Sequence, residues 1–179
     1  MAKLTITEAL AEVKLIEKKL VKKRENVLAN LSRYSHVQDP MQSDGGTTSW
    51  IEKEHQSMKD LQTRLEKIRS GIADANLKTE VTVGEASKSV FEWLTWKREV
   101  APGYLGFLKQ VHMSTKTALD QQNARPGLVT DSDGKQKLVE LVLNVNYLDY
   151  LKQAEKANDL LEALDGQLSL KNATVLINV

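Results

Sequence analysis

A seven-residue spacing of apolar side chains over the first 75 residues constrains this fold more than any other feature. One row of the first segment consists of Ile6, Val13, Leu20, Val27 and Tyr34. A second row runs between these positions and carries two charges at its centre: Leu10, Glu17, Arg24 and Leu31. Repetition over four heptads predicts a long helix packed as a coiled coil.

A second segment repeats the pattern. Its two rows are Ile51, Met58, Leu65 and Ile72, with Leu61, Ile68 and Ala75 between them. Residues 35–49 separate the segments and contain Pro40, Gly45 and Gly46, which is typical of a loop. Two heptad helices of similar length joined by one loop predict a long antiparallel α-hairpin over residues 5–76.

Capping boxes predict where these helices begin. Thr5 precedes Glu8 by three residues, and Ser49 precedes Glu52 by three. In this arrangement the hydroxyl and the carboxylate each bind a backbone N–H of the first turn. We expect Thr5 and Ser49 to be the N-caps, and Asn76 to end the second helix.

The second half of the chain reads as strands and helices within the same single domain, residues 1–179. Short β-branched runs predict strands near 79–83, 138–145 and 175–179, which we expect to pair in one small β-sheet. Ser89 and Asn146 are candidate starts of two further helices. The polar residues 114–137 predict a long mobile loop. The expected fold class is mainly α, a coiled-coil hairpin with two more helices and a small sheet.

A weak repeat relates the two halves. Residues 68–83 and 164–179 both read as the end of a heptad helix, an Asn, a Thr and a β-branched run. Each half would then send a helix into a short strand, although Asn and Thr are common after helices and the repeat can arise by chance.

Aromatic residues concentrate in VFEWLTWKREVAPGYLGFL, residues 90–108. On a helical wheel Trp93 and Trp96 share a broad apolar arc, which must be buried against the α-hairpin or a second subunit. Lys97 falls within this arc, beside the Trp93 indole, and Pro102 should interrupt or kink the helix. The candidate protein interface is Phe91, Trp93, Trp96, Lys97, Tyr104 and Phe107.

A basic run, KLIEKKLVKKR, offers a different surface. We define the basic stripe as its five lysines: Lys14, Lys18, Lys19, Lys22 and Lys23. These side chains could contact phosphates or an acidic partner, or could form the solvated outer face of a coiled coil. The chain's net charge is only +1, so any attraction to nucleic acid must be local.

Nothing in the sequence indicates catalysis. The chain has no Cys, its three His are scattered, and no phosphate-binding loop or nucleophile elbow occurs. Residues 131–134 resemble a calcium loop, but the Gly is misplaced and the twelfth-position Glu is missing. We therefore expect no enzyme, cofactor or metal, and no membrane partner, because no apolar run is long enough to span a bilayer.

Two segments, WLTWKREVAPG and LDGQLSLKNAT, resemble an uncharacterised family of small helical proteins encoded by tailed bacteriophages and prophages. The order of elements resembles, more distantly, an uncharacterised bacterial family with a long helical hairpin. The resemblance brings no catalytic residues. It implies a phage context and a virion or assembly role, for a protein made in the host cytoplasm.

These observations lead to two expectations. The first is a non-enzymatic structural or assembly protein of a tailed-phage virion that oligomerises and binds other virion proteins. The second is an intracellular module that binds nucleic acid or regulates a partner through the basic stripe.

Overall fold

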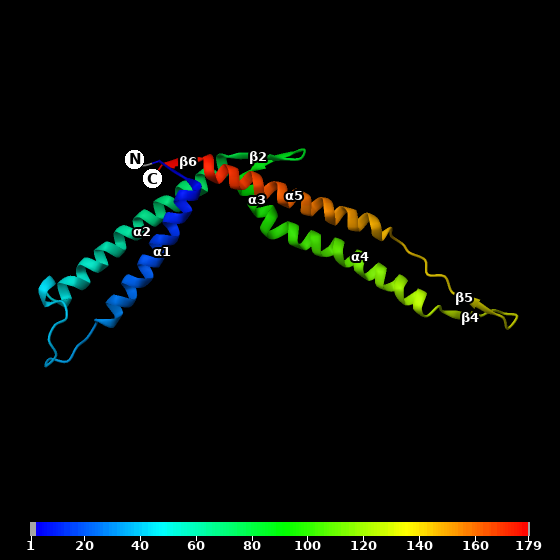
Figure 1. The fold of residues 1–179 in the computed structure, drawn as a ribbon, viewed down its shortest axis with the longest axis horizontal. Helices are drawn as coiled ribbons and strands as arrows, with labels where there is room; N and C mark the ends of the chain where they lie inside the picture. Colours follow the sequence, from blue (N-terminus) through cyan, green and yellow to red (C-terminus); the bar gives the residue numbers. More distant parts are fainter. Residues whose placement is uncertain (1–2, 179) are drawn as a thin grey trace. The chain divides into compact units, whose positions relative to one another are not determined.

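A computed structural model describes residues 3–178, most of which are helical (Figure 1). The helices are α1 (Ile6–Ala29), α2 (Thr47–Lys78), α3 (Val90–Thr95), α4 (Ala101–Ala124) and α5 (Tyr147–Thr174). A 3-10 turn lies at Gln42–Asp44 and a π-helical turn at Trp96–Val100. The strands are β1 (Lys3–Thr5), β2 (Glu80–Val83), β3 (Ala86–Ser89), β4 (Leu128–Thr130), β5 (Gln136–Leu138) and β6 (Leu176–Asn178). The prediction of a mainly α fold is confirmed.

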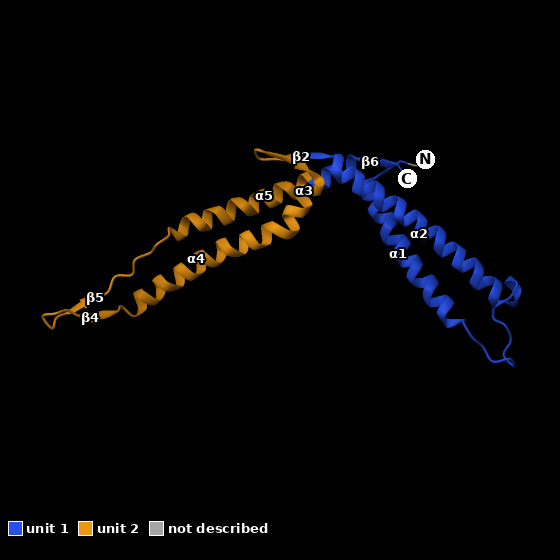
Figure 2. Ribbon diagram, turned by 180° about the vertical axis from the view of Figure 1, so that it is seen from behind, with its two compact units in different colours: residues 1–80, 168–179 blue, residues 81–167 orange. Residues whose placement is uncertain are grey.

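The chain forms two compact units, which Figure 2 colours separately. Unit 1 comprises residues 1–80 and 168–179, and unit 2 comprises residues 81–167. The last turns of α5, together with β6, therefore belong to unit 1 although they follow unit 2 in sequence.

Unit 1 contains the predicted α-hairpin, in which α1 packs against α2. Its core consists of Ile6, Ala9, Val13, Ile16, Ile68 and Ile177. The Thr5 capping box is confirmed, because the Thr5 hydroxyl accepts the Glu8 N–H and the Glu8 carboxylate accepts the Thr5 N–H at 2.8 Å. Of the two rows expected on α2, Ile68 lies in this core and Leu61, Leu65, Ile72 and Ala75 pack against it. Ile51 and Met58 are half-buried.

The second row expected on α1 is wrong. Leu10 and Leu31 are 42% and 61% exposed, whereas Ala9 and Ile16 are buried beside Ile6 and Val13. The second buried row thus lies one residue earlier than expected, at Ala9 and Ile16, and Leu10 lies outside the core. Moreover α1 ends at Ala29, so Leu31 and Tyr34 lie beyond the helix.

The predicted Ser49 cap is also wrong. α2 begins at Thr47 after Gly46, with no capping side chain at the position preceding it. Instead Asp39 reaches back from the loop, where its carboxylate accepts the N–H of Thr47 at 3.0 Å and that of Met41 at 2.9 Å. At its other end α2 continues past Asn76 to Lys78.

The sequence predicted one small sheet, but the strands form three separate antiparallel pairs: β1 with β6, β2 with β3, and β4 with β5. In the first pair Leu4 faces Ile177 across the ladder. The predicted strand 138–145 is wrong except at Leu138, the last residue of β5, which lies opposite Leu128 of β4. Residues 139–145 carry no strand, although the Val139 N–H still donates to the Gly127 carbonyl at 2.8 Å, just before β4.

The expected mobile loop 114–137 is likewise corrected. Residues 114–124 continue α4, and β4 and β5 form a hairpin in the remainder. Asp131 builds the hairpin turn, because one carboxylate oxygen accepts the N–H groups of Asp133 and Lys135. Gly134 supplies the positive φ of 75° that the turn requires.

The weak repeat corresponds to a repeated order of elements. In each half a strand runs into a capping box, at Thr5 and at Ser89, and the last helix runs into a short strand. The two strands of the repeat do not pair with each other. β2 pairs with β3 in unit 2, and β6 pairs with β1 in unit 1.

Candidate protein interaction surfaces

Trp93 lies in the core of unit 2. Its side chain is 2% exposed, and its indole N–H donates a hydrogen bond of 2.8 Å to the Val81 carbonyl of β2. The Ser89 capping box starts α3, four residues before Trp93. Trp96 is half-buried and meets the Trp93 ring edge-on at 5.7 Å. Both tryptophans therefore serve packing within the chain.

The helical wheel placed Lys97 beside the Trp93 ring, but in the structure Lys97 does not lie over that ring. Its ammonium group pairs with the Asp165 carboxylate of α5. Lys88 of β3 takes the expected place, 5.0 Å from the centre of the Trp93 ring. Lys97 lies elsewhere because α5 supplies the Asp165 carboxylate, and the wheel of one helix does not include the side chains of another.

Pro102 does not stop the helix. The residues before it form the π-helical turn Trp96–Val100, in which the Ala101 N–H reaches back to the Trp96 carbonyl. Pro102, which has no backbone N–H, then follows directly as the second residue of α4, next to the point where the helix changes from π to α geometry.

Beyond this turn apolar side chains face solvent. We define the aromatic face as Val100, Gly103, Tyr104 and Phe107, which lie three and four residues apart. Val100, Tyr104 and Phe107 are 52%, 46% and 55% exposed. A Cβ added to Gly103 would meet no atom within 4 Å, so this surface is open at its centre.

The aromatic face borders α5. The Phe107 ring meets the Tyr150 ring edge-on at 6.2 Å, and the Tyr104 hydroxyl donates a long hydrogen bond of 3.4 Å to Gln153. These contacts hold the two rings in place while leaving about half of each side chain exposed. Phe91, also 54% exposed, lies on the earlier helix α3.

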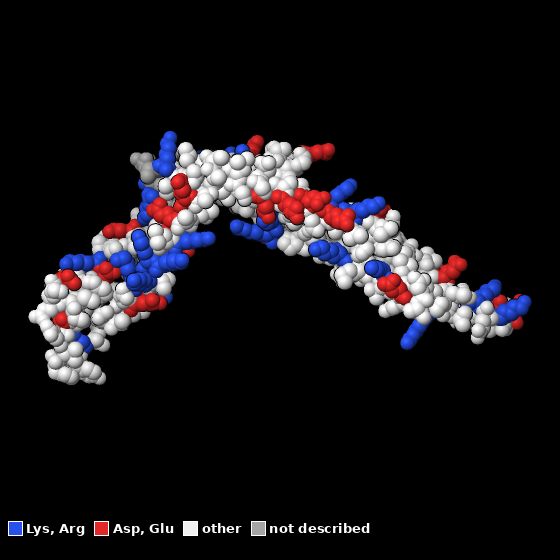
Figure 3. Space-filling view, in the orientation of Figure 1, with Lys and Arg blue, Asp and Glu red and all other residues white. Residues whose placement is uncertain are grey.

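The basic stripe is divided by the structure. Lys23 binds both carboxylate oxygens of Glu54 on α2, at 2.8 and 3.0 Å. Lys14, Lys18 and Lys22 are exposed, and within residues 3–178 they make no ion pair; Lys19 is exposed as well. Figure 3 shows Lys and Arg side chains gathered over α1.

Further ion pairs join α1 to α2. Arg64 binds Glu12 through two nitrogens, at 2.8 and 3.1 Å, and Arg69 binds Glu17. The Arg64 hydrogen bonds lower the pKa of Glu12. The charges in the middle of the first segment are thus partly used to align the hairpin.

One surface of unit 2 was missed by the sequence reading. α5 carries three exposed acidic residues at helical spacing, Glu155, Asp159 and Glu162, and Figure 3 shows carboxylates along this helix. Their i, i+4, i+7 spacing in the sequence indicates that they share one face of a helix. The partner of Lys97, Asp165, follows on the next turn, but no pattern in the sequence identifies that pairing.

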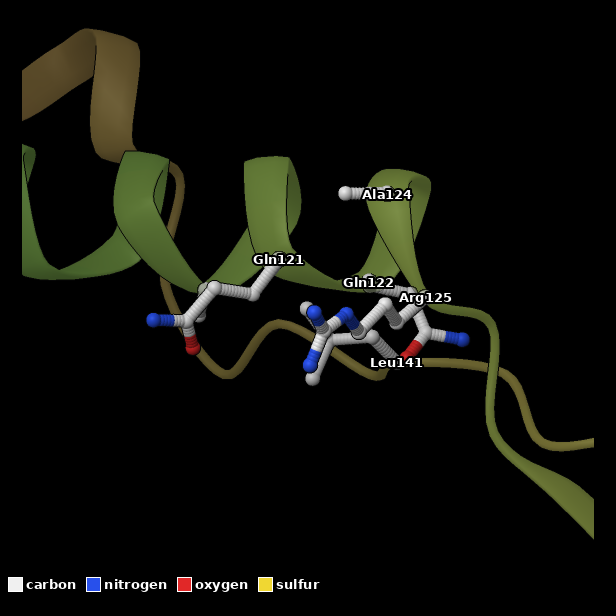
Figure 4. A pocket seen from close by; sticks show the side chains of 6 residues that line it. Gln121, Gln122, Ala124, Arg125 and Leu141 are labelled. Carbon is white, nitrogen blue, oxygen red and sulfur yellow. The ribbon is translucent and has the colours of Figure 1, made fainter.

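A shallow hollow lies at the end of α4, beside residues 139–142 (Figure 4). It is lined by Ala118, Gln121, Gln122, Ala124, Arg125 and Leu141. The Gln122 amide donates to the Val139 carbonyl, and Arg125 is the one charged side chain of the lining. These amide, alkyl and guanidinium groups include no nucleophile or proton-transfer pair.

The histidines remain apart. His36 stacks on Tyr34, and His112 packs against Tyr147. Among residues 3–178 no three His, Asp or Glu side chains converge as a metal site would require, and no helix there is long and apolar enough to cross a bilayer.

Comparisons with protein-family models, with curated proteins and with solved structures found no match to this chain.

Proposed function

We propose that this protein is a non-enzymatic assembly protein of a tailed-phage particle, which works by oligomerising and by binding other particle proteins through its helical surfaces. The observation that carries the proposal is the aromatic face. Its two rings are held by Tyr150 and Gln153, yet about half of each remains exposed. A contiguous exposed apolar surface on a soluble domain marks a site of protein contact.

Two further features support an assembly role. Aromatic residues with fixed orientation lose little conformational entropy on binding, which favours Tyr and Phe as anchors in interfaces. The phage context itself rests on the resemblance of WLTWKREVAPG and LDGQLSLKNAT to phage-encoded helical proteins.

Mass spectrometry of purified phage particles from the bacterium that encodes the chain tests the particle assignment. We expect the chain in particles, or in assembly intermediates lacking DNA. Its absence from both would overturn the assignment.

The role of the aromatic face is tested by Tyr104→Ser with Phe107→Ser. Because both side chains are exposed, folding should be preserved and incorporation into particles should fall at least about tenfold, as for loss of interface anchors. Leu31→Ser is the matched control, since it removes an apolar side chain that is 61% exposed in unit 1. Equal incorporation of the two variants would contradict a role for the aromatic face.

A further inference from the structure

Two rows of charged side chains on different helices have matching spacing. The α1 row consists of Lys14, Lys18, Lys22 and Glu25, and the α5 row consists of Lys152, Glu155, Asp159 and Glu162. Every one of these residues is exposed, and none makes an ion pair within residues 3–178. Each row lies on the side of its helix opposite the buried residues.

Three like charges repel one another within each row. Lys14, Lys18 and Lys22 stand four residues apart, so that neighbouring ammonium groups repel. Glu155, Asp159 and Glu162 place carboxylates at spacings of four and three, and in each row only the fourth residue, Glu25 or Lys152, has the opposite charge. An oppositely charged row placed alongside would relieve both repulsions.

The rows match in only one direction. Antiparallel alignment brings unlike charges together at four successive levels: Lys14 with Glu162, Lys18 with Asp159, Lys22 with Glu155, and Glu25 with Lys152. At 1.5 Å per residue the α1 row spans about 16 Å and the α5 row about 15 Å, so the levels stay in step. Parallel alignment would instead set Lys14 against Lys152 and Glu25 against Glu162.

The match continues past the charges. Leu28, three residues after Glu25, would lie level with Leu148, four residues before Lys152. These leucines are 59% and 47% exposed, so their contact would bury apolar surface at the end of the charged rows.

We propose that the chain associates with a second copy of itself, the α1 row of one copy lying antiparallel on the α5 row of the next. This proposal rests on one part of the proposed function, the oligomerisation of the chain, and names the surfaces that make the contact. Each copy offers one row of each kind. The contact therefore either forms twice within a dimer or continues from copy to copy, as in rings and filaments.

Sedimentation velocity of the full chain at about 0.05 and 1 M salt is the first test, since screening at high salt removes attraction between exposed charges. We expect species larger than 20.1 kDa at low salt that dissociate at high salt. A monomer at both concentrations would overturn the proposal. If that monomer binds duplex DNA through the lysines of the α1 row, their partner is nucleic acid instead.

Charge-reversal variants test which surfaces meet. Variant A carries Lys14→Glu, Lys18→Glu and Lys22→Glu, and variant B carries Glu155→Lys, Asp159→Lys and Glu162→Lys. Each should be monomeric alone, because like charges then face one another, and a mixture of the two should assemble. The control Lys59→Glu, Lys67→Glu and Lys116→Glu has the net charge of variant A but leaves both rows intact, so it should assemble as the wild type does.

Assembly that appears in the mixture and in neither variant alone would support the contact. A mixture that stays monomeric, or a control that dissociates as variant A does, would refute it.

Single exchanges test the direction. Lys14→Glu should weaken association, and adding Glu162→Lys should restore it, whereas adding Glu155→Lys should not. Rescue by Glu155→Lys alone would overturn the antiparallel alignment. None of these measurements requires phage particles. Failure of the row contact would therefore leave the particle assignment standing, and failure of the particle assignment would leave the row contact standing.

Discussion

The indole N–H of Trp93 and the carbonyl of Val81 form a buried hydrogen bond of 2.8 Å between α3 and β2. Val81 itself is 1% exposed, so water cannot replace this donor. The bond joins the start of the aromatic segment to the strand that follows α2 in sequence. It explains why an aromatic-poor chain uses a tryptophan here, where a large apolar ring must also satisfy a carbonyl.

Trp93→Phe keeps an aromatic ring and removes the donor. We expect the free energy of unfolding to fall by about 1–3 kcal/mol, because the Val81 carbonyl stays buried without its partner. Urea unfolding followed by circular dichroism measures this. Phe91→Leu, at an exposed position of the same helix, should change stability by less than about 0.5 kcal/mol, and a loss equal to that of Trp93→Phe would contradict the explanation.

Asp39 gives the loop between α1 and α2 a specific dependence on pH. Hydrogen bonds from the Thr47 hydroxyl and N–H, and from the Met41 N–H, lower the pKa of Asp39 to about 2. A carboxyl whose pKa is depressed in the folded state stabilises that state above its unfolded pKa of about 4, and this contribution is lost as pH falls toward 2.

Asp39→Asn should therefore lower the melting temperature at pH 7 and have little effect at pH 2. Thermal unfolding of both proteins across this range measures the difference, and Asp44→Asn in the same loop is the control. A melting-temperature difference that persists unchanged at pH 2 would show that the charge of Asp39 is not the cause.

The sequence pattern was sufficient for features that depend on neighbours along the chain. The capping box at Thr5 and the helix start at Ser89 follow from residues next to them in the chain, although the capping-box pattern at Ser49 is misleading. There the loop supplies Asp39, eight residues before Thr47, and a more distant acceptor replaces the local one.

Features that depend on distant segments could not be predicted in this way. Whether Ala9 or Leu10 faces the core depends on the segments packed against α1, and hydrophobicity alone favours Leu10. The pairing of β1 with β6 joins the two ends of the described chain, and nothing near either strand specifies it. Lys97 was assigned to the Trp93 ring because the wheel of one helix cannot show Asp165 on another.

The ion pair between Arg64 and Glu12 should contribute modestly to the alignment of α1 and α2. Their side chains are 34% and 30% exposed, so solvent screens the pair and about 0.2–1 kcal/mol is expected. Glu12→Arg alone and Arg64→Glu alone should each destabilise the hairpin, and the double exchange should recover most of the loss. A double-mutant cycle by urea unfolding measures the coupling; additive losses would contradict a direct interaction.

Gly103 should respond to substitution by gaining stability. It lies inside α4 at an ordinary helical φ, and an added Cβ meets no atom within 4 Å. Gly103→Ala should raise the free energy of unfolding by about 0.5–1 kcal/mol, because alanine loses less backbone entropy in a helix. Urea unfolding tests this, with Gly106→Ala as the second open helical position. A loss of stability for either variant would show that the glycine is needed for packing within the chain.

Gly71 on α2 should behave in the opposite way when the side chain is large. Its added Cβ would lie 3.4 Å from Ile177 Cδ1 and 3.7 Å from the Asn178 carbonyl oxygen, so β6 occupies the space above it. Gly71→Leu has no room for its remaining carbons and should displace Ile177, which is 4% exposed and part of the unit 1 core. We expect a loss of about 1–3 kcal/mol, the usual range for overpacking. Hydrogen exchange should then show β1 and β6 losing protection while β2 and β3 keep theirs. Gly166→Leu, on α5 where an added Cβ meets no atom within 4 Å, is the matched control, and equal effects of the two substitutions would exclude a specific contact between Gly71 and β6.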